Sequence, residues 1–220
     1  MNTGANTEVI GHGVYPLRRA AALIGTTPAK LRRWTRGTSK SDPLFTARYR
    51  GLDTTELSFI DLVEARVVNA LRAEGISLQA IRTAIEIAKD LFGEDRPFAS
   101  SRFRTDGAEV FLELERDGSL HRLSRRMPGQ GVFPSVVGPT LKDIDYGDGR
   151  AQRWTPAGHP TVVIDPARAF GRSIIATTGV PTETLAASAA RHGIELTALD
   201  FEVDEADVAA AVAFEEPLAA

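Results

Sequence analysis

Two short blocks of hydrophobic residues at helical spacing open the chain. The first block is amphipathic, because two arginines lie opposite an apolar face formed by Leu17, Ala20, Ala21 and Ile24. Gly25 favours the left-handed conformation that ends a helix, and Thr27 followed by Pro28 is typical of the start of the next one. The second helix is expected over residues 28–36, before Gly37. Two short helices joined by a tight turn predict a helix-turn-helix.

The second helix is basic on the faces that Leu31 and Trp34 leave free. The sequence has no acidic residue between Val9 and Ser41. A helix face that is merely solvated usually mixes charges of both signs, so this bias favours contact with DNA phosphates over simple solvation. Trp34, three residues after Leu31, is expected to lie in the core.

Strand-forming residues flank Gly51-Leu52-Asp53 after the second helix. Residues 44–50 and 56–59 are predicted to pair as a small two-stranded wing. Arg48 and Arg50 alternate along the first strand, which would place both on its outer face.

Two longer amphipathic helices are predicted after the wing. The first begins at Ser58, which forms a capping-box pattern with Asp61, and it ends at Gly75. The second begins at Ser77 and keeps its apolar spacing as far as Phe92. Residues 14–97 are therefore predicted to form a winged helix-turn-helix DNA-binding domain, preceded by a flexible tail at residues 1–13.

Helical spacing is lost after Pro97, and turn signals become frequent. Residues 109–116 and 119–124 flank Asp117-Gly118, a dipeptide favoured in tight turns, and they predict a β-hairpin. Residues 127–149 are rich in Gly and Pro, and residues 152–155 predict a further strand. We expect residues 98–158 to be a β-rich connecting segment.

Residues 159–220 predict a small acidic domain of three helices with a short strand pair. The expected elements are strands at residues 162–164 and 173–175, a helix capped by Thr182, an apolar piece at residues 194–199 and a last helix at residues 204–215. The predicted fold class is therefore mainly α with small β elements.

The two ends of the chain carry opposite charge, although the formal net charge is only -3. Residues 1–50 hold nine Lys/Arg and two acidic residues, whereas residues 154–220 hold three Lys/Arg and ten acidic residues. Such asymmetry is expected when one end of a chain meets phosphate and the other meets a different partner.

Composition and motifs disfavour several other classes of protein. The sequence has no cysteine and only four dispersed histidines, so neither disulfides nor a metal site is expected. It has no P-loop, dinucleotide-binding glycine pattern or nucleophilic serine motif, so we assign no catalytic residue and no cofactor. It also has no apolar run long enough for a bilayer and no secretory signal, so we expect a cytoplasmic protein without a membrane partner.

The order of the N-terminal features resembles the MerR-like winged helix-turn-helix. The segment YPLRRAAALIGTTPAKLRRWTRG matches the opening pattern of that family, and LSFIDLVEARVVNALRAEGISLQAIRTAI matches its helix pair. The resemblance covers most of residues 14–92 and implies that the second helix approaches the major groove. The long dimerisation helix and the effector site of metal- or drug-sensing MerR-like activators are not visible in this sequence.

DNA binding is assigned to basic residues of both helices and of the wing, together with the helix cap. These residues are Arg18, Arg19, Thr27, Lys30, Arg32, Arg33, Arg36, Arg48 and Arg50.

The C-terminal unit resembles a small domain of unknown function that occurs in antitoxins encoded beside PIN-like ribonuclease toxins. The matching positions are Val163-Ile164-Asp165-Pro166, Phe170-Gly171-Arg172 and Gly179-Val180-Pro181-Thr182. Together with the MerR-like domain, the arrangement resembles VapB-type antitoxins over nearly the whole chain, and the match is weakest between Gly193 and Val203. Several matching positions are expected chiefly to shape turns and anchor the core. Partner binding is assigned to Phe170, Arg172, Glu183 and Phe214.

Three functions are compatible with the sequence. The favoured one is a homodimeric antitoxin of a type II toxin–antitoxin system, which neutralises a PIN-like toxin protein and represses its own operon by binding double-stranded operator DNA. The alternative is a MerR-like transcriptional regulator that responds to a small molecule, with residues 98–158 as the sensor. An enzyme that pairs Asp165 with Asp200 or Asp204 ranks last, because neither spacing nor a partner base supports it.

Overall fold

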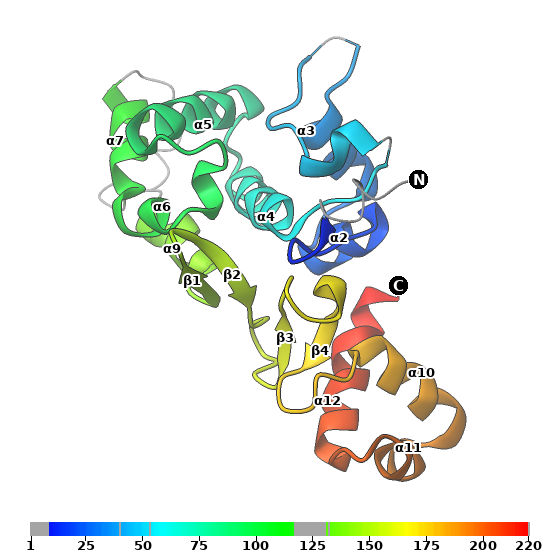
Figure 1. Cartoon of the computed structure of the whole chain (residues 1–220). Coiled ribbons are helices and arrows are strands. Elements are labelled where there is room, and N and C mark those ends of the chain that lie inside the picture. Colours follow the sequence, from blue (N-terminus) through cyan, green and yellow to red (C-terminus); the bar gives the residue numbers. More distant parts are fainter. Residues whose placement is uncertain (1–8, 40, 53, 117–130, 132, 220) are drawn as a thin grey trace.

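The computed structural model describes residues 9–219 except residues 40, 53, 117–130 and 132. Over these residues the chain is mainly helical and contains a small four-stranded antiparallel sheet, so the predicted fold class is confirmed at this level. Figure 1 shows the N-terminal helices in the upper part of the view, the C-terminal helices at the lower right and the sheet between them.

The two predicted short helices are confirmed as α2 (Leu17–Leu23) and α3 (Pro28–Arg36). The Thr27 side chain accepts a hydrogen bond from the Lys30 backbone N–H, which caps α3 at its start. Gly37, with φ of 75°, ends the helix. Thus the local signals of cap and stop determine where this helix begins and ends.

The predicted two-stranded wing is wrong in the described residues. Residues 44–47 form no strand, Arg48–Leu52 forms the 3₁₀ helix η1, and Leu57 makes only an isolated bridge with Tyr15. Arginine side chains bind the backbone here, since Arg82 donates to the carbonyls of Asp42 and Pro43, just before the predicted strand, and Arg96 donates to the carbonyl of Thr46 within it. These three backbone acceptors are thus satisfied without a β-ladder.

The two longer helices are confirmed as α4 (Phe59–Ala73) and α5 (Leu78–Phe92). Ser58 and Asp61 form the expected capping box at the start of α4, and Ser77 caps α5. Of the predicted flexible tail, residues 1–8 lie outside the described residues. Gly13 packs against η1, where its carbonyl accepts a 2.6 Å hydrogen bond from the Tyr49 hydroxyl.

The chain remains helical after Pro97, contrary to the expectation of a β-rich segment. Three helical elements follow in order, η2 (Pro97–Ala99), α6 (Ser101–Asp106) and α7 (Ala108–Arg116). The first arm of the predicted hairpin, residues 109–116, is therefore wrong, and residues 119–124 lie outside the described residues. Val110, Phe111 and Leu114 are buried whereas Leu112 is 52% exposed, which is the spacing of a helix and not of a strand.

The sheet begins after the π-helical turn η3 (Phe133–Val137) and α9 (Gly138–Leu141). Its strands are β1 (Ile144–Gly147), β2 (Arg150–Trp154), β3 (Val162–Ile164) and β4 (Ser173–Ile175), arranged in chain order. The expected strands at residues 152–155, 162–164 and 173–175 are thus confirmed, although β2 begins two residues earlier than predicted and ends one earlier. The two halves of the sheet meet through the pair Trp154 and Ile164.

Three helices follow the sheet. The 3₁₀ turn η4 (Ala169–Gly171) lies between β3 and β4, and after β4 come α10 (Thr182–His192), α11 (Ile194–Phe201), α12 (Glu205–Glu215) and the turn η5 (Glu216–Leu218). Thr182 does not cap α10, since Pro181 holds the cap position and the Thr182 hydroxyl lies 2.5 Å from Glu215 Oε1. The predicted apolar piece at residues 194–199 belongs to α11.

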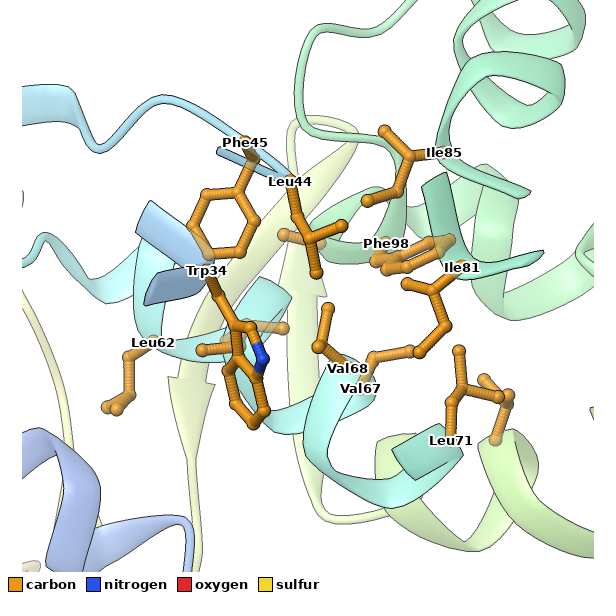
Figure 2. Packing of buried hydrophobic residues seen from close by; sticks show 14 of the residues in the cluster. Trp34, Leu44, Phe45, Leu62, Val67, Val68, Leu71, Ile81, Ile85 and Phe98 are labelled. Atoms are coloured by element: carbon orange, nitrogen blue, oxygen red, sulfur yellow. The ribbon is translucent and has the colours of Figure 1, made fainter. Parts of the chain in front are cut away.

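Buried hydrophobic residues form two clusters joined by β3. The larger cluster runs from Tyr15 to Ile164 and includes the meeting point of α3, α4 and α5 around Trp34, Val67 and Ile81 (Figure 2). The smaller cluster lies between the β3–β4 strand pair and the C-terminal helices and includes Val162. Because Val162 and Ile164 of β3 belong to different clusters, this strand connects the N-terminal helices to the C-terminal unit.

Candidate nucleic-acid interface

Helix α3 presents three exposed cations, Lys30, Arg32 and Arg33, on the side away from the core. Its other side is fixed, because Leu31 is fully buried and Trp34 is 3% exposed. None of the three cations makes an ion pair within residues that the structure describes. The helix therefore offers unneutralised positive charge on a rigid support, as contact with phosphate requires.

Two other predicted contact residues have structural partners. The Arg36 guanidinium donates to the Thr54 carbonyl and thereby ties the end of α3 to the segment after η1. The Thr27 side chain caps α3. Both residues position the helix, whatever else they contact.

The neighbours Arg18 and Arg19 have different surroundings. Arg18 is exposed on α2. Arg19 donates to both oxygens of Glu215, at 2.5 and 2.7 Å, and the two side chains are only 24% and 12% exposed. Arg19 therefore joins α2 to α12, the last long helix of the C-terminal unit.

Arg48 and Arg50 lie exposed in η1, which takes the place of the predicted wing. Asp61 holds this turn against the start of α4, because its Oδ2 accepts from the Arg48 backbone N–H at 2.9 Å and from Ser58. Arg96 lies 3.0 Å from the other oxygen of Asp61. The Asp61 carboxylate thus fixes the position of η1, which carries Arg48 and Arg50, relative to the start of α4.

A polar cleft of about 960 Å³ lies beside η1, between the start of α4 and the strands β1 and β2. Its cations are Arg48, Lys89, Arg96, Arg150 and Arg153, and its carboxylates are Asp95, Asp145 and Asp165. Three of the cations already pair with carboxylates, namely Arg96 with Asp61, Arg150 with Glu94 and Arg153 with Asp145. With the pairing carboxylates Asp61 and Glu94 included, five carboxylates face the five cations, so the cleft has no strong preference for an anion.

His12 lies at the edge of this cleft, with its Nε2 3.0 Å from the Arg48 guanidinium. Burial, then the positive charges of Arg48 and Arg150, lower the pKa of His12 below its ordinary value. The imidazole is therefore neutral near pH 7 and can accept from Arg48. In the described ranges no group of three or more His, Asp or Glu side chains is arranged to hold a metal ion.

The structure brings three of the four predicted partner-binding residues together. Phe170, Arg172 and Glu183 line a cavity of about 350 Å³ that also borders α2. Arg172 and Glu183 form an exposed ion pair at 3.0 Å. Phe214 lies apart from them in the smaller core cluster, 5% exposed, with its ring against His159.

Phe170 has an unusual backbone conformation. It is 64% exposed with φ of 56°, and the residue before it, Ala169, has φ of 46°. Two successive non-glycine residues in the left-handed region are uncommon and store conformational strain. The Phe170 carbonyl accepts from the Val14 N–H at 2.9 Å, which fixes this turn to the segment before α2.

No protein-family model matches the chain. The crystal structure of Rv2018 from Mycobacterium tuberculosis has the same fold, with a TM-score of 0.73 and 28% sequence identity over 90% of this chain and 96% of that one. A second similarity is to a Mycobacterium tuberculosis protein named as a candidate antitoxin, VapB45, which is 29% identical over 188 residues, or 76% of this chain and 78% of that protein.

The chain is thus similar in sequence, over most of its length, to a protein that carries an antitoxin name. Among the described residues, no helix has both the length and the apolar character needed to cross a membrane.

Proposed function

We propose that this chain is the DNA-binding antitoxin of a type II toxin–antitoxin pair, which neutralises a PIN-like ribonuclease and represses its own operon in the cytoplasm. The observation that carries the proposal is the 29% identity to a protein named as an antitoxin, over about three quarters of both chains. The opposite charges of the two ends support it, because an operator and a protein partner would engage different surfaces. In this proposal the protein acts through binding and has no enzymatic step.

The DNA-binding half of the proposal rests on α3, within a MerR-like domain at residues 14–97. A helix of this size fits the major groove, and Lys30, Arg32 and Arg33 would reach base edges and flanking phosphates from its exposed side. Arg18 on α2 and Arg48 and Arg50 in η1 are also exposed and would contact phosphate. Arg19 and Arg36 would first have to leave Glu215 and Thr54, so we assign them mainly to positioning.

The operator is expected to contain two half-sites. A single α3 reads only a few base pairs, and helix-turn-helix proteins reach useful specificity by placing two recognition helices about one turn of DNA apart. We therefore propose that the chain binds its operator as a homodimer.

The DNA-binding half of the proposal is tested by measuring affinity for a double-stranded fragment of the promoter of the gene that encodes this chain. Arg32→Ala and Arg33→Ala should each weaken binding and lower the slope of log affinity against log salt by about 1, because one phosphate contact is lost. Arg191→Ala is the matched control, since Arg191 is exposed on α10 and should leave both values unchanged. Equal affinity for all three variants, or affinity that does not depend on salt, would refute the assignment.

Co-expression with a PIN-like ribonuclease, which the proposal expects to be encoded beside this chain, tests the antitoxin half. A tagged copy of the chain should retain the ribonuclease through purification at moderate salt. Failure of the two proteins to co-purify would refute the antitoxin half while leaving DNA binding to be judged separately.

A regulator that responds to a small molecule is the second candidate function. The observation that favours it is the cleft of about 960 Å³, because residues 145 and 150–153 of the proposed sensor segment line it beside η1. An operator affinity that changes with a metabolite, and not with the ribonuclease, would favour this candidate over the antitoxin.

A further inference from the structure

Helix α11 turns its two leucines outward, although Phe201 at its end packs against the smaller core cluster. Leu196 is 54% exposed and Leu199 is 74% exposed, whereas Thr197 is fully buried and Ala198 is 7% exposed. A helix that packs against a core normally buries its leucines and exposes its polar residues. The polarity of α11 is therefore inverted.

Specific contacts hold the inverted orientation. The buried Thr197 hydroxyl donates to Ser188 Oγ of α10 at 3.0 Å, so this polar group is satisfied. The helix lies between two left-handed residues, Gly193 with φ of 84° and Glu202 with φ of 53°. Rotation of α11 to bury its leucines would break the hydrogen bond and change both turns.

Carboxylates flank the two leucines. Residues four apart are neighbours on a helix surface, so Glu195 lies beside Leu199 and Asp200 lies beside Leu196. Both acidic residues are exposed. We name these four residues the acidic ridge; the surrounding sequence reinforces its charge, because residues 192–220 contain eight Asp/Glu and no Lys/Arg.

We infer that the acidic ridge docks into an apolar groove with a basic rim on the ribonuclease, with Leu196 and Leu199 as its anchors. This inference rests on the proposed function and assigns its partner-binding surface. Side chains at positions i and i+3 are the usual anchors when a helix enters a groove, and a few buried anchors supply most of the binding energy. The flanking carboxylates speed the approach of a basic partner and align it.

Charge complementarity selects this occupant over a second copy of the chain. In a symmetric dimer across α11 the same patch meets itself, which would bring the Glu195 and Asp200 of two copies together. Like charges placed face to face across an interface are unfavourable. A basic partner removes this repulsion and covers the leucines.

The test uses the full-length chain and the purified ribonuclease, with the dissociation constant as the readout. Leu196→Gln and Leu199→Gln should each weaken binding about tenfold, which corresponds to about 1.4 kcal/mol. Glutamine keeps the helix propensity of leucine, and both positions are exposed, so thermal unfolding should be unchanged. Leu112→Gln is the matched control, because Leu112 is 52% exposed on α7 and should bind as the wild type does.

Charge reversal provides a second, independent readout. Glu195→Lys with Asp200→Lys should slow association at low salt, and the effect should shrink as salt is added. Glu216→Lys, an exposed change in η5, should alter the association rate much less.

The outcomes separate the ridge from the proposed function. If the wild-type chain does not bind the ribonuclease, the proposed function fails and the ridge assignment fails with it. If the wild type binds and both leucine variants bind equally well, the ridge assignment is overturned and the antitoxin function stands. If the leucine variants change only the oligomeric mass of the isolated chain, the ridge is a contact between copies and the inference is again overturned.

Discussion

Replacement of Asp143 by alanine should loosen the sheet from helix α4. The Asp143 carboxylate accepts two hydrogen bonds from the Arg66 guanidinium of α4, at 2.8 and 2.9 Å. It accepts a third from the Trp154 indole Nε1 of β2 at 3.0 Å, and the Arg66 guanidinium carbon lies 4.4 Å from the centre of the Trp154 ring. One carboxylate therefore connects the N-terminal helices to the strands.

The size of the effect follows from burial. The Arg66 and Asp143 side chains are 16% and 11% exposed, so water cannot fully replace the lost carboxylate. Removal of one partner of a buried pair costs about 3–5 kcal/mol, and the residual exposure places this case near the lower end, at about 3 kcal/mol. For a chain of this length, the melting temperature should fall by about 6–12 °C.

Urea denaturation followed by tryptophan fluorescence measures this loss, since Trp154 belongs to the affected cluster. Asp145→Ala is the matched control. Its carboxylate pairs with Arg153 at 2.6 Å, but the two side chains are 58% and 50% exposed. Surface pairs contribute about 0–1 kcal/mol, so the control should lose little stability. Equal losses in the two variants, or less than about 1 kcal/mol for Asp143→Ala, would refute the role given to the buried pair.

Three further changes test other parts of the structure. Burial raises the pKa of Glu64 to about 7, so folding favours its protonated form. The contribution of Glu64 to the free energy of unfolding should therefore fall by roughly 3 kcal/mol as pH rises from about 4.5 to about 7. The difference in unfolding free energy between the wild type and Glu64→Gln, measured in urea titrations, should show this pH dependence. Gly37→Ala should lower the melting temperature much more than Gly93→Ala. A Cβ at Gly37 would meet the Ser41 carbonyl oxygen at 2.5 Å, whereas a Cβ at Gly93 would meet nothing within 4 Å. Similar falls in melting temperature for the two variants would contradict this explanation. Glu215→Gln removes the charged partner of Arg19 and should speed amide hydrogen exchange in α12 about tenfold. Exchange in α5 is the internal control, and an unchanged exchange rate in α12 would show that the ion pair does not stabilise this helix.

Helices with strong local signals could be predicted from the sequence. Thr27, Ser58 and Ser77 each cap a helix at the expected position, and each is followed by apolar residues at helical spacing. A cap and a periodic face act within one or two turns, so the sequence near each helix contains the information needed to place it.

Elements that depend on distant partners could not be predicted in this way. The segment before η1 reads as a strand but forms none, and residues far along the chain bind its backbone: Arg96 donates to the Thr46 carbonyl within it, and Arg82 to the carbonyls of Asp42 and Pro43 just before it. Residues 109–116 precede Asp117-Gly118, a dipeptide favoured in hairpin turns, so the sequence predicts a strand there. In the structure they form a helix, with Val110 and Leu114 buried at helical spacing. In both cases a local turn signal competed with tertiary packing, which decided the structure.

In the candidate site, too, some features follow from the local sequence and others depend on distant partners. The exposure of Lys30, Arg32 and Arg33 follows from their helix period. By contrast, Arg19 pairs with Glu215, a residue 196 positions away, and no spacing rule links two such positions. The inverted polarity of α11 also escaped prediction, because apolar residues in a short segment are normally taken as core.

Neutralisation of the proposed PIN-like ribonuclease partner can be measured most directly by titrating the purified full-length chain into that ribonuclease while following cleavage of an RNA substrate. If the chain is an antitoxin, cleavage should fall in proportion to the added chain and stop near a fixed molar ratio. Undiminished cleavage in the presence of excess chain would contradict the proposed function.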